Sequence, residues 1–582
     1  MLVAFGDKLI FTVFVMALVF AMRNFLKEAE VFSPDNVLGY IGELSRFHRI
    51  QGSRGLVEAA EYLMKELERA GVRAELIEDV YDGKKWHLTL ASPIAWDLVY
   101  GEVEIEGEKL TTTKIPLLVM AHSPPGRAEG EVLHIERDED WEKAEGKIVL
   151  VGQKWYENYR KANEAGAKAF IAYRKGTGNA FPYIGLFLTK KDLEWAKIPA
   201  VAFSEKLAGR IIGKLKKGES VRIKIEVDTA ISGEQKLPMV FARVGKPPYL
   251  LFTAHLCHPT PGANDNASGS AMLVELARLL SELYREEFRI GFAFLWVPEH
   301  LGTQAFVATL KDLEDYYAVI NLDMVGGSED RSSSTIMVIR TPLSRFSIIS
   351  GLLEYFIGLA NSQGESFGGS PLPKMKIKSY PYEMGSDHDV FNIFGVPAVM
   401  PITWPDRFYH SSEDTIEKIS KDSLEIIGKA VLATALSLAK ADKGELERFA
   451  RAFAMKYLGE LGMENELEIG EKLVMKGLAR DSKFLGLEIG HPFEFEPWIR
   501  WEKKGLVSAR SVRQIDREKG EELAKLMEDR KFMVLLHELL MLGEILPEEL
   551  AYRALEEEYG KFDKEKLEKA LEILETLGWI SQ

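Results

Sequence analysis

The stretch that most constrains the fold runs from Pro248 to Gly269, PYLLFTAHLCHPTPGANDNASG. Its apolar run Leu250–Phe252 predicts a buried strand, and two histidines, His255 and His258, follow at the end of that strand. A turn rich in proline and glycine then brings Asp265 back, and a helix begins directly after it. In an open α/β sheet, ligands bind outside the carboxyl ends of the strands. We therefore expect a functional site where this strand ends.

The rest of the chain supplies the other strands of an α/β fold. Apolar runs of strand length alternate with segments of helical periodicity, which predicts a doubly wound sheet. The strands are expected over residues 72–80, 236–244, 289–297, 317–324 and 395–402, and the helices over residues 271–284, 346–361 and 420–441, with two more helices within residues 35–71.

Several of these strands end in, or lead to, a residue that can bind a metal ion. The set is His255, Asp265, Glu299, Asp323 and His410. Imidazole and carboxylate donors together suit zinc, and a zinc site with an open position is catalytic. One bridging carboxylate would hold two ions roughly 3.5–4 Å apart. Any one of these residues alone is more often a cap, a solvated charge or a structural histidine, so the prediction depends on all five recurring at one edge of the sheet.

Four motifs sharpen this prediction. Pro261–Gly269 reads PGANDNASG, Asp323 stands in NLDM, Ser386–His388 reads SDH, and His410–Ser412 reads HSS. In this order they resemble the motifs of the M28 family of zinc aminopeptidases. The resemblance implies an α/β/α metallopeptidase sandwich, built from residues 31–112 and 232–445.

The resemblance also implies roles for the matching residues. It makes His255 and Asp323 terminal ligands of one metal ion, Asp265 the bridging ligand, and His410 a ligand of the other ion. Asp387, in the SDH motif, is expected to lie beside the ligands without binding metal. The family further implies a cis peptide bond directly after Asp265.

Two departures from the family pattern affect the expected site. Cys257 stands where the family has an aspartate that orients the first histidine, which either removes a carboxylate or brings a thiolate near the metal. The family's Glu-Glu pair, a general base followed by a ligand, is Glu299–His300 here. Aligned without gaps, Glu299 is the base and His300 a further candidate ligand, which is the interpretation we favour. Shifted by one residue, Glu299 is the ligand and no base remains.

Two other segments are not expected to contain catalytic residues. Residues 113–231 contain GKIVLV at Gly146–Val151 and AGA at Ala165–Ala167, and they resemble a protease-associated domain; the alternative is an unrelated small β-rich insertion. Residues 446–582 are helical and look like a winged-helix module. Acidic residues outnumber basic ones from Arg517 onward, so we expect this module to serve packing or oligomerisation rather than nucleic-acid binding.

Composition limits the partners and the compartment. A net charge of −15 over 582 residues argues against a nucleic-acid partner, and the single cysteine favours a reducing compartment. Residues 1–30 form an apolar N-terminal extension, whose run over residues 9–22 is short for a spanning helix and lacks a clear cleavage site. This extension is a membrane anchor, an export signal or a segment translated from an upstream start. We favour the last, and therefore a cytoplasmic protein.

These features together predict a metal-dependent aminopeptidase. It would remove N-terminal residues from peptides through a metal-activated water, with Glu299 as the general base. One or two zinc ions are the expected cofactor, with cobalt or manganese as alternatives, and a homo-oligomer is compatible with the C-terminal module. Two other functions stay open: glutaminyl cyclisation on the same fold, and peptide binding with little or no catalysis.

Overall fold

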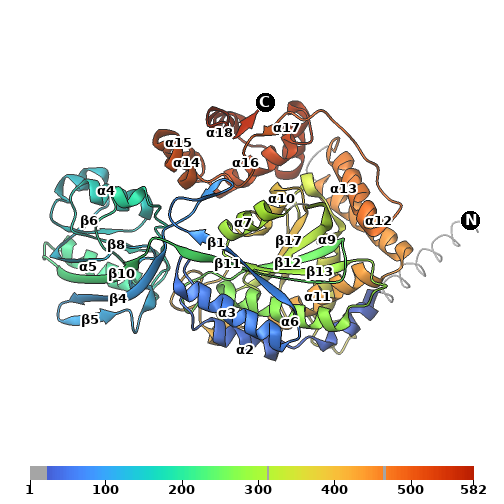
Figure 1. Ribbon diagram of the computed structural model, residues 1–582, viewed down its shortest axis with the longest axis horizontal. Coiled ribbons are helices and arrows are strands. Elements are labelled where there is room, and N and C mark those ends of the chain that lie inside the picture. The colour runs from blue at the N-terminus through green and yellow to red at the C-terminus, as the bar shows by residue number, and fades with distance from the viewer. Residues whose placement is uncertain (1–21, 311–312, 463–466) are drawn as a thin grey trace, which may run out of the picture.

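The computed structural model describes residues 22–310, 313–462 and 467–582 (Figure 1). An eight-stranded sheet forms its centre, so the predicted α/β class is confirmed. In spatial order its strands are β1 (Ala74–Tyr81), β11 (Gln235–Val244), β13 (Gly291–Val297), β12 (Tyr249–His255), β14 (Tyr316–Asn321), β17 (Ala398–Trp404), β15 (Thr335–Ile339) and β16 (Ile377–Tyr380).

The four central strands β13, β12, β14 and β17 run parallel, and their carboxyl ends share one edge of the sheet. Every residue of β12, β13 and β14 is buried, as expected for a parallel sheet covered on both faces. β1, β11 and β15 add antiparallel pairs, which makes the sheet mixed. The sequence did not predict β15 and β16, which are short strands outside the parallel core.

Helices cover both faces of this sheet. One face carries α2 (Pro34–Leu44), α3 (Arg54–Arg69), α6 (Gly269–Leu283) and α11 (Lys421–Lys440), and the other carries α7 (Leu301–Thr309) and α10 (His388–Ile393) (Figure 1). α9 (Ile348–Ala360) packs against α11, and α8 (Glu329–Ser332) is a single turn. The side chains of Ser33, Ser53 and Ser420 accept hydrogen bonds from first-turn amides, and so cap α2, α3 and α11.

A second, seven-stranded sheet lies beside the first and has a hydrophobic core of its own (Figure 1). Its strands are, in spatial order, β5 (Glu108–Thr111), β4 (Trp96–Ile105), β10 (Arg222–Ile231), β6 (Gly126–His134), β7 (Ile148–Val151), β8 (Ala169–Tyr173) and β9 (Ala200–Phe203), with helices α4 (Trp155–Glu164) and α5 (Glu205–Lys216). This sheet begins at Trp96, before residue 113, where the sequence suggested a boundary. The difference arises because β4 pairs with the distant β10, and local patterns do not report such pairing. A short hairpin precedes β4, and each of its strands, β2 (Trp86–His87) and β3 (Leu90–Ala91), has two residues.

The C-terminal part is helical and covers one end of the molecule. α12 (Lys443–Leu461) and α13 (Gly470–Leu485) pack beside α9, and α16 (Arg530–Gly543) lies over the face that carries α7 and α10 (Figure 1). The remaining elements are α14 (Ala509–Ile515), α15 (Arg517–Leu526), α17 (Glu548–Tyr559), α18 (Lys564–Thr576) and the strand pair β18 (Arg500–Trp501) with β19 (Ile580–Ser581). Its buried apolar side chains join the core of the main sheet.

Of the predicted N-terminal extension, residues 1–21 lie outside the described residues, and residues 22–30 are described. Within residues 22–310, 313–462 and 467–582, no helix combines the length and the apolar character that crossing a bilayer requires.

Candidate metal centre

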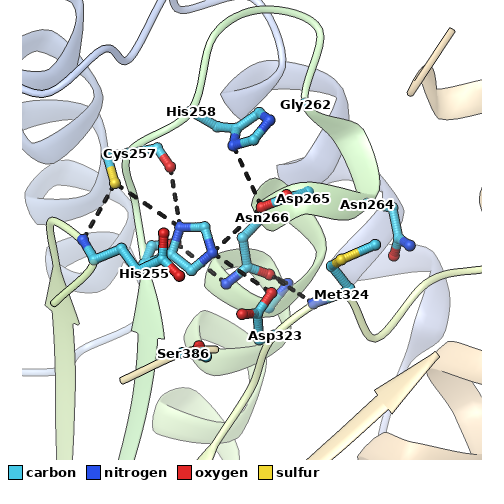
Figure 2. Close-up of polar contacts among 12 residues, drawn as sticks. His255, Cys257, His258, Gly262, Asn264, Asp265, Asn266, Asp323, Met324 and Ser386 are labelled. Carbon is cyan, nitrogen blue, oxygen red and sulfur yellow. Dashed lines mark hydrogen bonds and ion pairs between the residues drawn. The ribbon is translucent and has the colours of Figure 1, made fainter. Parts of the chain in front are cut away.

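His255 is the last residue of β12 and points its ring into the site (Figure 2). Its Nδ1 donates to the carbonyl oxygen of Cys257 at 3.0 Å, so Nε2 is the nitrogen that faces the carboxylates of Asp265 and Asp323. Although burial opposes it, the charges of Asp323 and Glu299 raise the pKa of His255 well above its usual range, so this imidazole would release a proton on binding a metal ion. A backbone carbonyl thus does what an aspartate does in the resembling family. The sulfur of Cys257 lies 4.0 Å from the same Nδ1 and accepts a hydrogen bond from the amide of Glu299 at 3.2 Å (Figure 2).

The loop that follows is braced by a buried arginine. Arg49 donates from its guanidinium to the carbonyl oxygens of Leu256 at 2.8 Å and Gly262 at 3.2 Å, and its backbone pairs in both directions with that of His258. A cationic side chain shared among carbonyl oxygens that would otherwise be buried and unpaired fixes the loop in one conformation. His258 is therefore held over the site rather than free on a surface turn.

Asp265 stands in a buried turn, Ala263–Ser268, ahead of α6, and the backbone of Asp265 and Asn266 there is not helical. The peptide bond between Asp265 and Asn266 is cis, as the resemblance implied. Amides of Asn264 and Asp265 donate to the carboxylate of Asp414 at 2.8 and 3.0 Å. The side chain of Asn266 spans the carbonyl oxygens of His255 and Leu322, which ties the turn to two strand ends (Figure 2).

The carboxylate of Asp265 is shared by two groups of candidate ligands. In the first, here the His255 group, Asp265 Oδ1 lies 3.3 Å from His255 Nε2, which lies 3.5 Å from Asp323 Oδ1. In the second, the His258 group, Asp265 Oδ1 lies 3.3 Å from His258 Nδ1, and Oδ2 lies 3.1 Å from His410 Nε2. Within each group the three candidate ligand atoms lie within 4.8 Å of one another. The structure thus brings four residues of the predicted set together, with His258 added.

The chemistry of these donors fits divalent metal ions. Asp323 Oδ1 is buried, and it accepts no hydrogen bond from any residue that the structure describes. Burial, together with the nearby His410 and His255 rings, lowers the pKa of His258 well below its usual range, so its imidazole is neutral and keeps a lone pair. Although burial opposes it, the surrounding histidines hold the pKa of Asp265 well below its usual range, so that carboxylate is ionised. Neutral imidazoles and ionised carboxylates are the forms that bind zinc.

Glu299 follows β13 and lines the same cavity as both groups, without belonging to either. Its amide donates to Cys257 Sγ, and its carbonyl oxygen accepts a hydrogen bond from Gln51 at 3.1 Å, so the backbone of this turn is fixed. Burial raises the pKa of its carboxyl to about 7, with the charges of Asp323 and Asp387 acting in the same direction. A carboxyl with a pKa near neutrality, beside candidate metal ligands, is suited to moving protons.

His300, the expected further ligand, is absent from both groups. Its backbone is left-handed, with φ of 56°, and Asp387 accepts a hydrogen bond from its amide at 2.7 Å. The ring therefore turns towards Asp389, whose Oδ2 lies 3.8 Å from His300 Nε2. Asp387 contacts this turn and the hydroxyl of Thr303, so it supports the Glu299–His300 segment rather than the ligands themselves.

His258 takes the position that the sequence prediction gave to His300. The signal was present in the sequence, because His258 lies only three residues after His255. The family's Glu-Glu pair aligns with the end of β13 instead, so the sequence prediction placed the further ligand there. The proline-rich turn after His258 and the Arg49 brace, which is remote in sequence, decide which histidine faces Asp265.

A cavity of about 460 Å³ opens directly on the two groups. One wall carries Glu299 and the candidate ligands, and the other is apolar. Met337, Ile339 and Met400 form a small buried cluster in that wall, with Tyr380, Ile402 and Trp404 packed against it. Polar groups thus converge at one end of a pocket that is otherwise suited to an apolar side chain.

The second sheet also reaches the site. Tyr183, in the loop after β8, packs its ring 5.0 Å from that of His258 and 5.2 Å from that of His410, measured between ring centres. Its amide donates to the carbonyl oxygen of His410, and Pro182 bridges to Ser411. The inserted segment therefore packs against both histidines of the His258 group.

The part of the chain that builds both ligand groups is similar to known proteins. Residues 240–435 match the family model described as Peptidase family M28. This region is similar to peptidase family M28, and it is called the M28 domain below. The M28 match covers the strand end with His255, the Asp265 turn, Asp323 and His410, which are the elements that build the two groups.

Relatives of the M28 domain bear peptidase names. Aminopeptidase YwaD of Bacillus subtilis (strain 168) is 27% identical over 332 residues, which are 52% of this chain and 64% of that protein. A probable zinc metalloprotease of Pyrenophora tritici-repentis (strain Pt-1C-BFP) is 29% identical over 213 residues, which are 31% and 44% of the two chains. The chain thus spans less than two thirds of the length of either relative.

Solved structures share the fold of the M28 domain. BSAP, a zinc aminopeptidase from Bacillus subtilis, aligns with a TM-score of 0.54 at 21% identity, over 71% of this chain and 96% of that chain. A putative peptidase from Clostridium acetobutylicum aligns with a TM-score of 0.51 at 16% identity, over 73% and 83%. At these identities the similarity establishes the common fold.

Proposed function

We propose that this protein is a metal-dependent aminopeptidase, which hydrolyses the first peptide bond of a peptide. The observation that carries the proposal is the shared carboxylate of Asp265, which lies between two three-donor groups beside the half-buried Glu299 in one cavity. The peptidase names of its relatives agree with this chemistry.

Each group would hold one divalent ion. His255 and Asp323 would bind the first ion, His258 and His410 the second, and Asp265 would bridge them. The mixed imidazole and carboxylate donors favour zinc, and cobalt or manganese would suit the same donors. Ions held there would polarise the substrate carbonyl group and acidify a water molecule.

Glu299 would then handle the protons. It lies free of both groups, and burial raises the pKa of its carboxyl to about 7, so at neutral pH it can accept a proton as well as give one. It would take a proton from the attacking water and pass it to the amine of the leaving peptide. The hydrogen bonds from the Glu299 amide to Cys257 and from Gln51 to the Glu299 carbonyl oxygen fix the backbone that presents this carboxylate.

The cavity suggests how the N-terminal residue is held. Its apolar wall, with the Met337, Ile339 and Met400 cluster, would take an apolar side chain. Glu383 also lines this cavity, and its carboxylate, which lies 3.9 Å from Arg530, would pair with the substrate's ammonium group in competition with that arginine. An acidic group placed to pair with the substrate's ammonium group would favour cleavage after the N-terminal residue, as in an exopeptidase.

The two accessory segments would act as walls of the site. The inserted segment, which resembles a protease-associated domain, would hold the His410 loop through Tyr183. The C-terminal segment, which looks like a winged-helix module, would cover the site rather than bind nucleic acid. Its apolar faces are packed into the common core, and an acidic surface does not suit a phosphate backbone.

Metal reconstitution tests the proposed function. Full-length protein is stripped of metal, reloaded separately with zinc, cobalt or manganese, and assayed on a panel of aminoacyl p-nitroanilides. We expect no turnover without metal, restored turnover with at least one ion, and a preference for large apolar residues. Ammonia release from peptides with N-terminal glutamine would indicate cyclisation instead, and bound metal with no turnover would indicate a binding protein.

A further inference from the structure

A second and larger cavity, of about 930 Å³, joins the first one at the candidate base. Segments of all three parts of the chain line it: Glu299 and Tyr409 near the M28 site, Lys154–Glu157 and Phe187 from the insertion, and Leu506–Ser511 from the C-terminal part. Glu299 and Tyr409 also line the first cavity, so the two spaces meet where the scissile bond would lie.

Charged side chains line this second cavity, and most of them have partners. Lys154 pairs with Glu528 at 2.6 Å, and Arg513 pairs with Glu157 at 2.6 Å. Arg530 donates to the carbonyl oxygen of Met384 at 2.9 Å and lies 3.9 Å from the carboxylate of Glu383. These cations are neutralised, or their donors are used, within the protein.

Arg510, in α14, is different. The centre of its guanidinium lies 4.8 Å from the ring centre of Phe187, across the boundary between the C-terminal part and the insertion. Among the residues that the structure describes, its guanidinium has no ion-pair partner and donates no hydrogen bond. It is half-buried and lines the cavity. Arginine stays charged even in such surroundings and prefers the planar, two-oxygen geometry of a carboxylate.

Arg510 is also close enough to the metal centre to act on the same substrate. Arg510 and Glu299 line the same cavity. Phe187, which the guanidinium of Arg510 contacts, belongs to the same inserted segment as Tyr183, whose ring packs against both histidines of the His258 group.

We propose that the second cavity binds the part of a peptide that follows the scissile bond, and that Arg510 binds a carboxylate on that part. This inference rests on the proposed aminopeptidase function, and it names the substrate class as short peptides with a negative charge on the leaving side. The carboxylate is either the C-terminus of a very short peptide or an acidic side chain. The first cavity holds one N-terminal residue, so the remaining residues extend from Glu299 towards Arg510.

Matched peptides test the inference. Zinc-loaded full-length protein is assayed at fixed pH and ionic strength on three substrates: Leu-Ala-Ala with a free C-terminus, Leu-Ala-Ala-amide, and Leu-Ala-Glu-amide. We expect kcat/KM to be roughly 10- to 100-fold higher for at least one charged peptide than for the neutral amide, which is the range for a charge-assisted hydrogen bond. The two charged peptides distinguish a terminal carboxylate from a side-chain carboxylate.

Variants tie that preference to Arg510. The quantity compared is the ratio of kcat/KM for the charged peptide to kcat/KM for the neutral amide. Arg510→Gln should reduce this ratio to about one, and Arg510→Lys should leave an intermediate ratio. Arg500→Gln, at an exposed arginine of β18, should keep the wild-type ratio. Loss of a purely structural contact would lower kcat/KM for all three peptides and leave the ratio unchanged.

Three experimental outcomes distinguish failure of the Arg510 inference from failure of the proposed aminopeptidase function. Equal rates of the wild-type protein on charged and neutral peptides overturn the inference, whether or not the variants fold. An unchanged ratio in Arg510→Gln also overturns it. Failure of the zinc-loaded wild-type protein to cleave leucine p-nitroanilide, which carries no carboxylate, overturns the proposed function instead.

Discussion

The peptide nitrogen of Tyr183 donates a hydrogen bond to the carbonyl oxygen of His410 at 2.7 Å. One residue belongs to the inserted segment, and the other is a candidate ligand of the M28 domain. The Tyr183 ring covers His258 and His410 at the same time. The insertion is therefore part of the metal centre's support, because it restrains the backbone that presents His410 and the rings that face Asp265.

Tyr183→Ala tests this support. Removing the ring frees His258 and His410 to rotate, and loss of a residue that orients metal ligands typically lowers metal affinity by about 10- to 100-fold. Tyr183→Phe is the matched control: the hydroxyl makes no hydrogen bond with the described residues, so the phenyl ring should preserve zinc affinity. Competition of each variant with a zinc chelator gives the affinities, and equal affinities for the Ala and Phe variants would remove Tyr183 from this role.

His258→Ala tests the second candidate ion. Because His258 is one of three donors in its group, we expect the variant to lose about one metal equivalent per chain and retain the ion of the His255 group. Metal per chain is measured after dialysis against metal-free buffer. His491→Ala, at an exposed histidine, controls for the loss of an imidazole as such and should keep the wild-type metal content. Full occupancy in His258→Ala would show that His258 is not a ligand.

A pair of neighbouring glutamates, the buried Glu538 and the half-buried Glu558, predicts a pH dependence of stability. Glu538 accepts hydrogen bonds from Ser344, and Glu558 accepts one from the amide of Leu343, so both anchor the C-terminal helices to the M28 domain. Burial raises the pKa of Glu538 to about 7. Burial, together with the charge of Glu538, raises the pKa of Glu558 well above its usual range.

The direction of the effect follows from proton binding. In an unfolded chain glutamate titrates near about 4.3, so between that value and the raised folded values the folded protein binds more protons. Stability is therefore greatest at the acid end of this window and falls as the pH rises through the folded pKa values. Glu558→Gln should remove part of this fall.

Thermal unfolding at pH 5 and pH 9 measures this difference. The drop in Tm from pH 5 to pH 9 should be smaller for Glu558→Gln than for the wild-type protein. Glu565→Gln, at an exposed glutamate of α18, should show the wild-type drop. Identical pH dependence in all three proteins would contradict a role for this glutamate pair.

Local sequence pattern predicted the parallel core of the fold well. Strands such as β12 are continuous apolar runs that end in polar residues, and these features are visible in a single sequence. Short strands such as β15 and β16 are not, because their pairing is decided by contacts remote in the chain. The pairing of β4 with β10 moved the start of the second sheet to Trp96 for the same reason.

The candidate site, like the fold, could be predicted only in part. His255, Asp265, Asp323 and His410 each follow a strand or a motif, and the structure brings their side chains together. His258, and not His300, faces Asp265 for two reasons: the backbone at His300 is left-handed, and the guanidinium of Arg49 holds the loop that carries His258. Neither feature can be inferred from the spacing of residues in the sequence. Motif position predicts which strand end contributes a ligand more reliably than it predicts which side chain does.

Glu299→Gln, with metal content and rate measured on the same sample, tests the central claim most directly. Glu299 lies outside both ligand groups, so the variant should keep the wild-type metal per chain. Its turnover of leucine p-nitroanilide should fall by at least roughly 10²- to 10⁴-fold, which is the contribution of general-base catalysis. Loss of metal in step with activity would make Glu299 a ligand, and full activity with full metal content would contradict the proposed mechanism.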